Sequence, residues 1–169
     1  MVRTAHPGRP LGHITREIQT LSDAFLAVRV LGWALVLPGL KRVLSVRSLA
    51  AIMHRDTHAT SRDADRERRI VTFARWGARL ARWKSGGNCL ERGLIAYRYL
   101  GEVGARPTLV VGVGRDASGV TGHAWVLVDG QLVGERPSSI QPYTPMFAFG
   151  PDGRLDADSL APPYQTPAS

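Results

Sequence analysis

The chain is short of cysteine. It has only one, Cys89, among 169 residues, so no disulfide can form within it. This excludes the small secreted folds that depend on several disulfides, and the chain is long enough to bury a real hydrophobic core without them. Metal-ligand patterns are scarce as well, because His54 and His58 stand four residues apart with no obvious third ligand. We expect a protein of a reducing compartment, with no metal and no other cofactor.

Long hydrophobic runs are also lacking. The longest apolar stretch, residues 24–40, is interrupted by Arg29 and by Pro38-Gly39, and its uninterrupted part is too short to span a bilayer. We expect a buried core helix here, with peripheral contact to a membrane as the less favoured alternative. The first thirteen residues are followed by no apolar segment and no small-residue cleavage pattern, so we expect no secretory signal and a cytoplasmic protein.

Acidic residues are outnumbered. The 14 aspartates and glutamates stand against 22 lysines and arginines, which gives a formal net charge of +8. Such a charge attracts any polyanion, but the arginines between residues 62 and 84 are more typical of a solvated helix face than of a binding surface. Charge alone does not indicate nucleic-acid recognition, and we expect no specific nucleic-acid partner.

Residue spacing divides the chain into a helical first half and a strand-rich second half. Residues 1–13 are rich in proline and glycine and are expected to form a loose arm. Apolar residues at helical spacing predict two or three short helices from residue 14 to about 53, broken at Pro38-Gly39, and a longer helix over 62–84. A further helix is predicted over 89–101.

The second half is rich in β-branched residues. Residues 107–114 and 123–128 are predicted strands, and Asp129-Gly130 is a hairpin turn into residues 131–135. Helices followed by antiparallel strands indicate an α+β domain. From Arg136 onward we expect an irregular tail with a few apolar anchors, because proline, glycine and serine are frequent there. The predicted parts are an N-terminal arm and helical region over 1–60, a core over 61–150 and a partly disordered tail over 151–169.

Cys89 lies where a thiol is readily activated. Asn88 is a good helix N-cap, and with Glu91 three residues later the segment predicts a capping box that puts Cys89 at the first helical position. Unpaired backbone N–H groups and the helix dipole at such a position favour a thiolate over a thiol. A lone cysteine is more often an inert buried residue, so a catalytic role depends on partners further along the chain.

His123 is the histidine best placed to act as a base for this thiol, because it opens a predicted strand directly after Gly122. A two-residue turn at Asp129-Gly130 would put Glu135 on the face of the hairpin opposite His123. A three-residue turn, with Gly130 in a bulge, would place the two side chains across from each other, about 5 Å apart at Cβ. We therefore predict the bulged turn and prefer Glu135 as the acid that orients His123, with Asp129 as its competitor.

The same segments resemble a known family. NCLERGLIAYRYL, PTLVVGVG and GHAWVLVDGQLVGE are similar to the core of transglutaminase-like cysteine proteases, and more narrowly to the leader peptidases of lasso-peptide biosynthesis. The resemblance covers roughly residues 62–135. It implies a transglutaminase- or papain-like fold, Cys89 as nucleophile, His123 as general base and acid, and Glu135 in the place where the family usually has aspartate.

The resemblance also implies a reaction and its partners. Such an enzyme cuts a ribosomally made precursor peptide between leader and core through a thioester, and a separate macrolactam synthetase then uses the freed amine. Residues 1–60 lack the strand-rich segment of a leader-recognition domain, so the expected partner is a separate leader-recognition protein, with the macrolactam synthetase as a further candidate. The backbone N–H of Cys89 would hold the oxyanion, and the candidates for a second donor or for support are Asn88, Trp83 and Trp125.

Two alternatives stay open at this point. The same three residues could pass the acyl group to an amine or attack a side-chain amide, as a transglutaminase or an amidase does. The chain could instead be a non-catalytic basic binding module whose thiol has an ordinary pKa.

Overall fold

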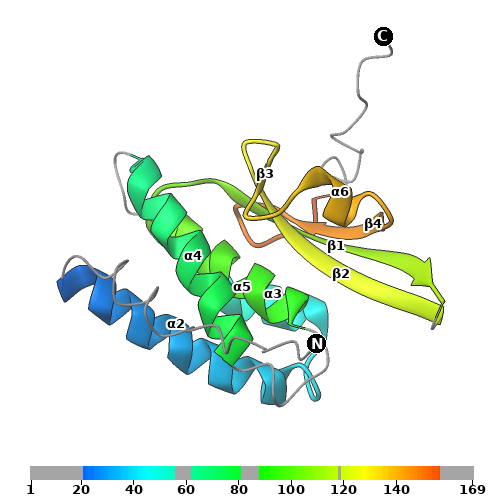
Figure 1. The fold of residues 1–169 in the computed structure, drawn as a ribbon, viewed down its shortest axis with the longest axis horizontal. Coiled ribbons are helices and arrows are strands. Elements are labelled where there is room, and N and C mark those ends of the chain that lie inside the picture. The colour runs from blue at the N-terminus through cyan, green and yellow to red at the C-terminus, as the bar shows by residue number, and fades with distance from the viewer. Residues whose placement is uncertain (1–20, 56–61, 81–87, 118, 157–169) are drawn as a thin grey trace, which may run out of the picture.

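The structure is a computed structural model that describes residues 21–55, 62–80, 88–117 and 119–156. Four helices, α2 to α5, gather on one face of a four-stranded antiparallel sheet with the strand order β3-β2-β1-β4, and the short α6 packs on the other face (Figure 1). The α+β class expected from the order of the segments is confirmed. The helices are α2 (Leu21–Leu40), α3 (Val46–Met53), α4 (Ala64–Leu80), α5 (Cys89–Glu102) and α6 (Pro137–Ile140), and the strands are β1 (Pro107–Asp116), β2 (Gly119–Val128), β3 (Gln131–Val133) and β4 (Thr144–Phe149).

Helix α5 is the centre of the hydrophobic core. It packs against α2, α3 and α4 as well as against β1 and β2, and every residue from Gly93 to Gly101 is buried. One apolar cluster joins Val30 of α2, Leu94 of α5 and Val126 of β2, so the first helices and the sheet share a single core on both sides of residue 60. A smaller cluster with Trp125 and Ile140 fills the other face of the sheet, since side chains alternate along a strand.

Helix α2 is the outermost helix, and it is buried on one face only (Figure 1). Val30 and Leu37 face the core, whereas Phe25 and Val28 are 65% and 69% exposed. The predicted break at Pro38-Gly39 is wrong, because Pro38 lies in the last turn of the helix and its missing N–H removes only one backbone hydrogen bond. By length and composition alone, α2 is the one helix among the described residues that could cross a membrane, and 28% of its most apolar window is buried.

The hairpin between β2 and β3 has a two-residue turn. Val128 pairs with Gln131, and the turn residues Asp129 and Gly130 both have positive φ, at 51° and 77°. This is the geometry of a type I′ turn, which matches the natural twist of two antiparallel strands. The predicted bulge at Gly130 is therefore wrong, and a different feature must bring Glu135 to His123.

The irregular tail predicted from Arg136 onward is wrong for the first part of that segment. Residues 137–149 form α6 and then β4. Strand β4 pairs with β1, with Phe149 opposite Leu109 and Phe147 opposite Val111. Pro145 is tolerated because β4 is an edge strand, and the register shifts beside its partner Gly112. Residues 157–169 lie outside the described residues, as does the predicted arm over 1–13.

Candidate active site

Cys89 is the first residue of α5, as its sequence context predicts. The N–H of Arg92 donates to the carbonyl of Asn88 at 3.0 Å, which closes the first turn of the helix. The predicted capping box does not form. The amide nitrogen of Asn88 instead donates to the carbonyl of Ala78 at 2.9 Å, and the buried Glu91 pairs with Lys41 at 2.6 Å. The Asn88 side chain thus ties the start of α5 to the end of α4 and holds the thiol in place.

His123 lies on β2 beside the thiol. The Sγ atom of Cys89 lies 3.8 Å from the carbonyl oxygen of Gly122, the residue before His123, and the imidazole of His123 lowers the pKa of the thiol. The Nε2 atom of His123 is 2.8 Å from Oε2 of Glu135, so Nδ1 is the nitrogen left for the thiol. Cys89, His123 and Glu135 are therefore brought together in the order of a nucleophile, a base and an orienting acid.

Two aromatic rings fix the plane of the imidazole. Tyr143 stacks on His123 with ring centroids 4.9 Å apart and an interplanar angle of 26°, and Trp125 stacks at 6.1 Å and 25°. Trp125 is 2% exposed and belongs to the apolar cluster under the sheet, so it supports the histidine by packing. Tyr143 follows α6, so its place beside His123 depends on the fold of that helix.

Glu135 reaches His123 because the chain turns at Gly134. Strand β3 ends at Val133, and Gly134 follows with φ of 75°, a conformation in which residues with a Cβ are strained. A Cβ at this position would also lie 2.6 Å from Cγ1 of Val71, so a side chain there would collide with α4. The regular ladder would have carried Glu135 to the wrong face. The left-handed glycine supplies the change of direction that the bulge was predicted to supply.

Arg92 is a further residue of the site. It lies three positions after Cys89, one helical turn along α5, and its guanidinium forms an ion pair with Oε1 of Glu135. The Glu135 side chain is 8% exposed, and both of its oxygens have partners: one binds Arg92 and the other binds His123. The spacing of Arg92 from Cys89 is visible in the sequence, but nothing local indicates that its partner is an acid 43 residues away.

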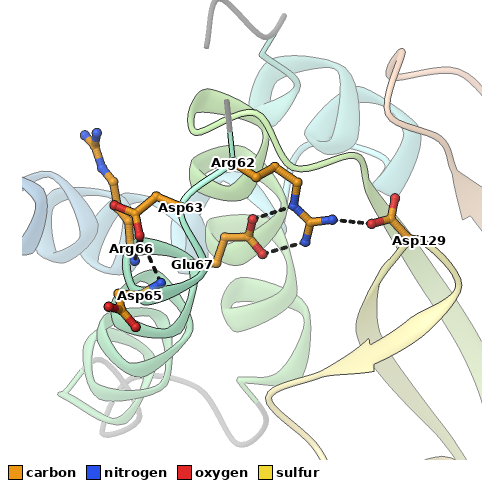
Figure 2. A network of polar contacts seen from close by, with 6 residues as sticks. All are labelled: Arg62, Asp63, Asp65, Arg66, Glu67 and Asp129. Carbon is orange, nitrogen blue, oxygen red and sulfur yellow. Dashed lines mark hydrogen bonds and ion pairs between the residues drawn. The ribbon is translucent and has the colours of Figure 1, made fainter. Parts of the chain in front are cut away.

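Asp129, the competitor for the orienting role, is engaged elsewhere. Figure 2 shows it bound to Arg62, whose guanidinium also holds Glu67 of α4 at 2.7 and 2.8 Å. Asp63, beside Arg62, caps α4 by accepting from the N–H groups of residues 65 and 66. This network joins the tip of the hairpin to the start of α4 and does not include His123.

The thiol and the imidazole shift each other's proton affinity. Burial is the largest single influence on the pKa of Cys89 and raises it, but the hydrogen bond to His123, the N–H groups of Ala124 and Leu90 and the charge of the imidazolium together lower that pKa below its usual value. The hydrogen bond to Cys89 and then the one to Glu135 raise the pKa of His123 to about 9. Both shifts favour a thiolate and imidazolium pair near neutral pH.

Comparison with known protein families matches residues 27–148 to the transglutaminase-like superfamily. The chain belongs to this superfamily. Searches of curated proteins and of solved structures found no match. The transglutaminase-like match includes Cys89, His123, Glu135 and Arg92, and it begins within α2, so the first helices belong to the same domain as the sheet. The superfamily fold is one of cysteine peptidases and acyltransferases, which agrees with an arrangement built around a thiolate.

The backbone N–H of Cys89 lies at the start of α5, the position of the candidate oxyanion donor. Trp83, one of the candidates for support, lies outside the described residues, and so does His58. The side-chain amide of Asn88 donates to the carbonyl of Ala78, so this residue helps to position the start of α5. Within the described ranges, no group of three histidine, cysteine, aspartate or glutamate side chains could hold a metal ion.

Proposed function

We propose that the chain is a cysteine peptidase that removes the leader from a ribosomally made lasso-peptide precursor. The observation that carries the proposal is the position of Cys89 beside Gly122 and of Glu135 on the imidazole of His123, with a lowered thiol pKa and a raised imidazole pKa. The choice of a leader peptidase rests on the resemblance of the segments NCLERGLIAYRYL and GHAWVLVDGQLVGE to that group.

The proposed reaction proceeds through a thioester. The thiolate of Cys89 attacks the scissile carbonyl, and its backbone N–H binds the developing oxyanion. The imidazolium of His123 then gives its proton to the leaving amine, the carbon–nitrogen bond breaks, and an acyl-enzyme remains. Neutral His123 next takes a proton from water, which attacks the thioester and releases the new carboxylate. Glu135 keeps the ring oriented throughout.

A partner protein is part of the proposal. A separate leader-recognition protein would deliver the precursor, and the macrolactam synthetase would receive the freed amine. The requirement of a reduced thiol supports a cytoplasmic location, since Cys89 acts only as a thiolate.

Cleavage of candidate precursor peptides tests the proposal. Mass spectrometry should show the leader and the core as separate products with the wild-type chain and a leader-recognition protein, and no products with Cys89→Ala. His123→Ala and Glu135→Ala should each slow cleavage by at least about tenfold. Arg115→Gln, which removes an exposed charge far along β1, is the matched control and should cleave normally. Undiminished cleavage by Cys89→Ala would refute the proposal.

The same experiment separates an acyltransferase from a peptidase. Hydrolysis adds the mass of water and divides the precursor, whereas acyl transfer to an amine joins two species with loss of ammonia or of an amine. This second function is favoured by the superfamily itself, which includes acyltransferases. A thiol without reactivity toward iodoacetamide below about pH 8 would point instead to a non-catalytic binding module.

A further inference from the structure

A polar hollow adjoins the acid of the active site. It has a volume of about 430 Å³ and is lined by Arg75, Arg92, Gly134, Glu135, Arg136 and Ser139. Its lining comes from α4, from α5 and from the chain between β3 and the end of α6. Three segments far apart in the sequence thus place three guanidinium groups around one carboxylate.

The charges in this hollow are not balanced. Glu135 is already shared between His123 and Arg92. Within the described part of the chain, neither Arg75 nor Arg136 has a carboxylate within ion-pair distance, and both are exposed. The hollow therefore keeps two positive charges that no acidic side chain described in the structure neutralises. Guanidinium groups bind carboxylates strongly through paired, charge-assisted hydrogen bonds.

The hollow lies close to the reacting thiol. Glu135 forms one of its walls and contacts His123, and the carbonyl oxygen of Gly122, the residue before His123, lies 3.8 Å from Sγ of Cys89. An extended peptide advances about 3.3 Å per residue. A few residues therefore cover the distance from the thiol past the His123 ring and the Glu135 carboxylate to the hollow. A ligand group in the hollow and a carbonyl at Cys89 can therefore belong to the same peptide.

We propose that this hollow binds a carboxylate of the peptide on which the enzyme acts, with Arg75 and Arg136 as its charge partners. The proposal rests on the proposed function, because it places the ligand on the peptide substrate. Arg92 remains with Glu135 and forms a fixed wall. The enzyme then prefers peptides with an acidic side chain close to the cleavage site.

Binding to the full chain with Cys89→Ala tests the site without cleavage. The probes are a short peptide with two adjacent glutamates, its twin with two glutamines, and inorganic phosphate, all at constant ionic strength. Nuclear magnetic resonance follows the backbone signals of Gly134 and Ser139. We expect the glutamate peptide to shift these signals and the glutamine twin to leave them unchanged.

Two double variants in the same background decide between a built site and general charge attraction. Arg75→Gln with Arg136→Gln should weaken binding of the glutamate peptide by about tenfold. Arg66→Gln with Arg115→Gln removes the same charge from exposed positions outside the hollow and should weaken it by less than about twofold.

Three results would overturn the carboxylate site. They are equal weakening by the two double variants, equal binding of the glutamine twin, and phosphate binding as tight as that of the glutamate peptide, which would indicate a site for free anions. Because the test uses Cys89→Ala, its outcome does not depend on cleavage. Failure of the wild-type chain to cleave any precursor, with glutamate binding intact, would refute the peptidase and leave the carboxylate site standing.

Discussion

Replacing Glu135 with glutamine isolates the electrostatic part of the site. The substitution keeps the size of the side chain and removes the negative charge that lies 2.8 Å from Nε2 of His123. Contacts with Cys89 and then with Glu135 raise the pKa of His123 to about 9. Without the carboxylate the imidazolium is less stable, and the thiolate that it supports becomes less stable with it. The pKa of His123 should fall, and the pKa of Cys89 should rise.

The size of the shift follows from the loss of one charged hydrogen bond. A bond to a charged partner contributes about 1.5–3 kcal/mol, against about 0.5–1.5 kcal/mol for a neutral one. A difference of about 1.4 kcal/mol corresponds to about one pKa unit. The imidazolium of Glu135→Gln should therefore lose its proton about one pH unit earlier than that of the wild type as pH rises. The pH range in which thiolate and imidazolium coexist narrows from both sides.

Alkylation of Cys89 by iodoacetamide measures this range directly, because the chain has no other cysteine. The rate is followed from about pH 5 to pH 10, a range that includes both titrations. The wild-type thiol should react well below the usual thiol pKa of about 8.5. In Glu135→Gln the lower inflection should move up and the upper inflection should move down by about one unit.

Asp129→Asn is the matched control for this experiment. It removes a carboxylate that binds Arg62 at the hairpin tip (Figure 2), while the oxygen that His123 contacts belongs to Glu135. Its profile should coincide with that of the wild type. An unchanged profile in Glu135→Gln, or the same shift in both variants, would refute the assignment of Glu135 as the orienting acid.

Three further predictions concern the surroundings of the site. Arg92→Gln should slow cleavage roughly tenfold, corresponding to about 1.4 kcal/mol in the barrier, because Glu135 loses the ion pair on its second oxygen, and Arg92→Lys should restore part of the rate. Gly134→Ala should lower the free energy of unfolding by about 1–3 kcal/mol in urea titrations, since alanine is strained at φ of 75° and meets Val71, and adding Val71→Ala should recover part of the loss. Asp129→Asn should leave the cleavage rate within about twofold of the wild type, and a large loss of rate would indicate that Asp129 belongs to the active site.

The start of α5 was predictable because its determinants are local. Asn88 ahead of an apolar helical pattern indicates a helix that begins at Cys89, and α5 does begin at Cys89. The role of the Asn88 side chain was not predictable, since it depends on Ala78, a residue of another helix. Local patterns therefore located the thiol, while the contacts that hold it come from packing.

The contact of His123 with Glu135 is present, but the predicted bulge at Gly130 is not what forms it. The hairpin register follows from the turn at Asp129-Gly130, and the turn is the two-residue type that these residues favour. The contact forms through Gly134, where both the left-handed backbone and the closeness of Val71 in α4 require a residue without a Cβ. No pattern in the strands contains this information.

Local patterns in the sequence were enough to place α4, α5, β1 and β2. Residue type limited the candidate nucleophile to Cys89 and the candidate base to one of five histidines. The contact of His123 with Glu135, the ion pair of Glu135 with Arg92 and the exposed apolar face of α2 became visible only in the folded chain. The reason is physical: helix and turn preferences act over a few residues, whereas ion pairs, burial and strand neighbours depend on segments that meet only after the chain has folded.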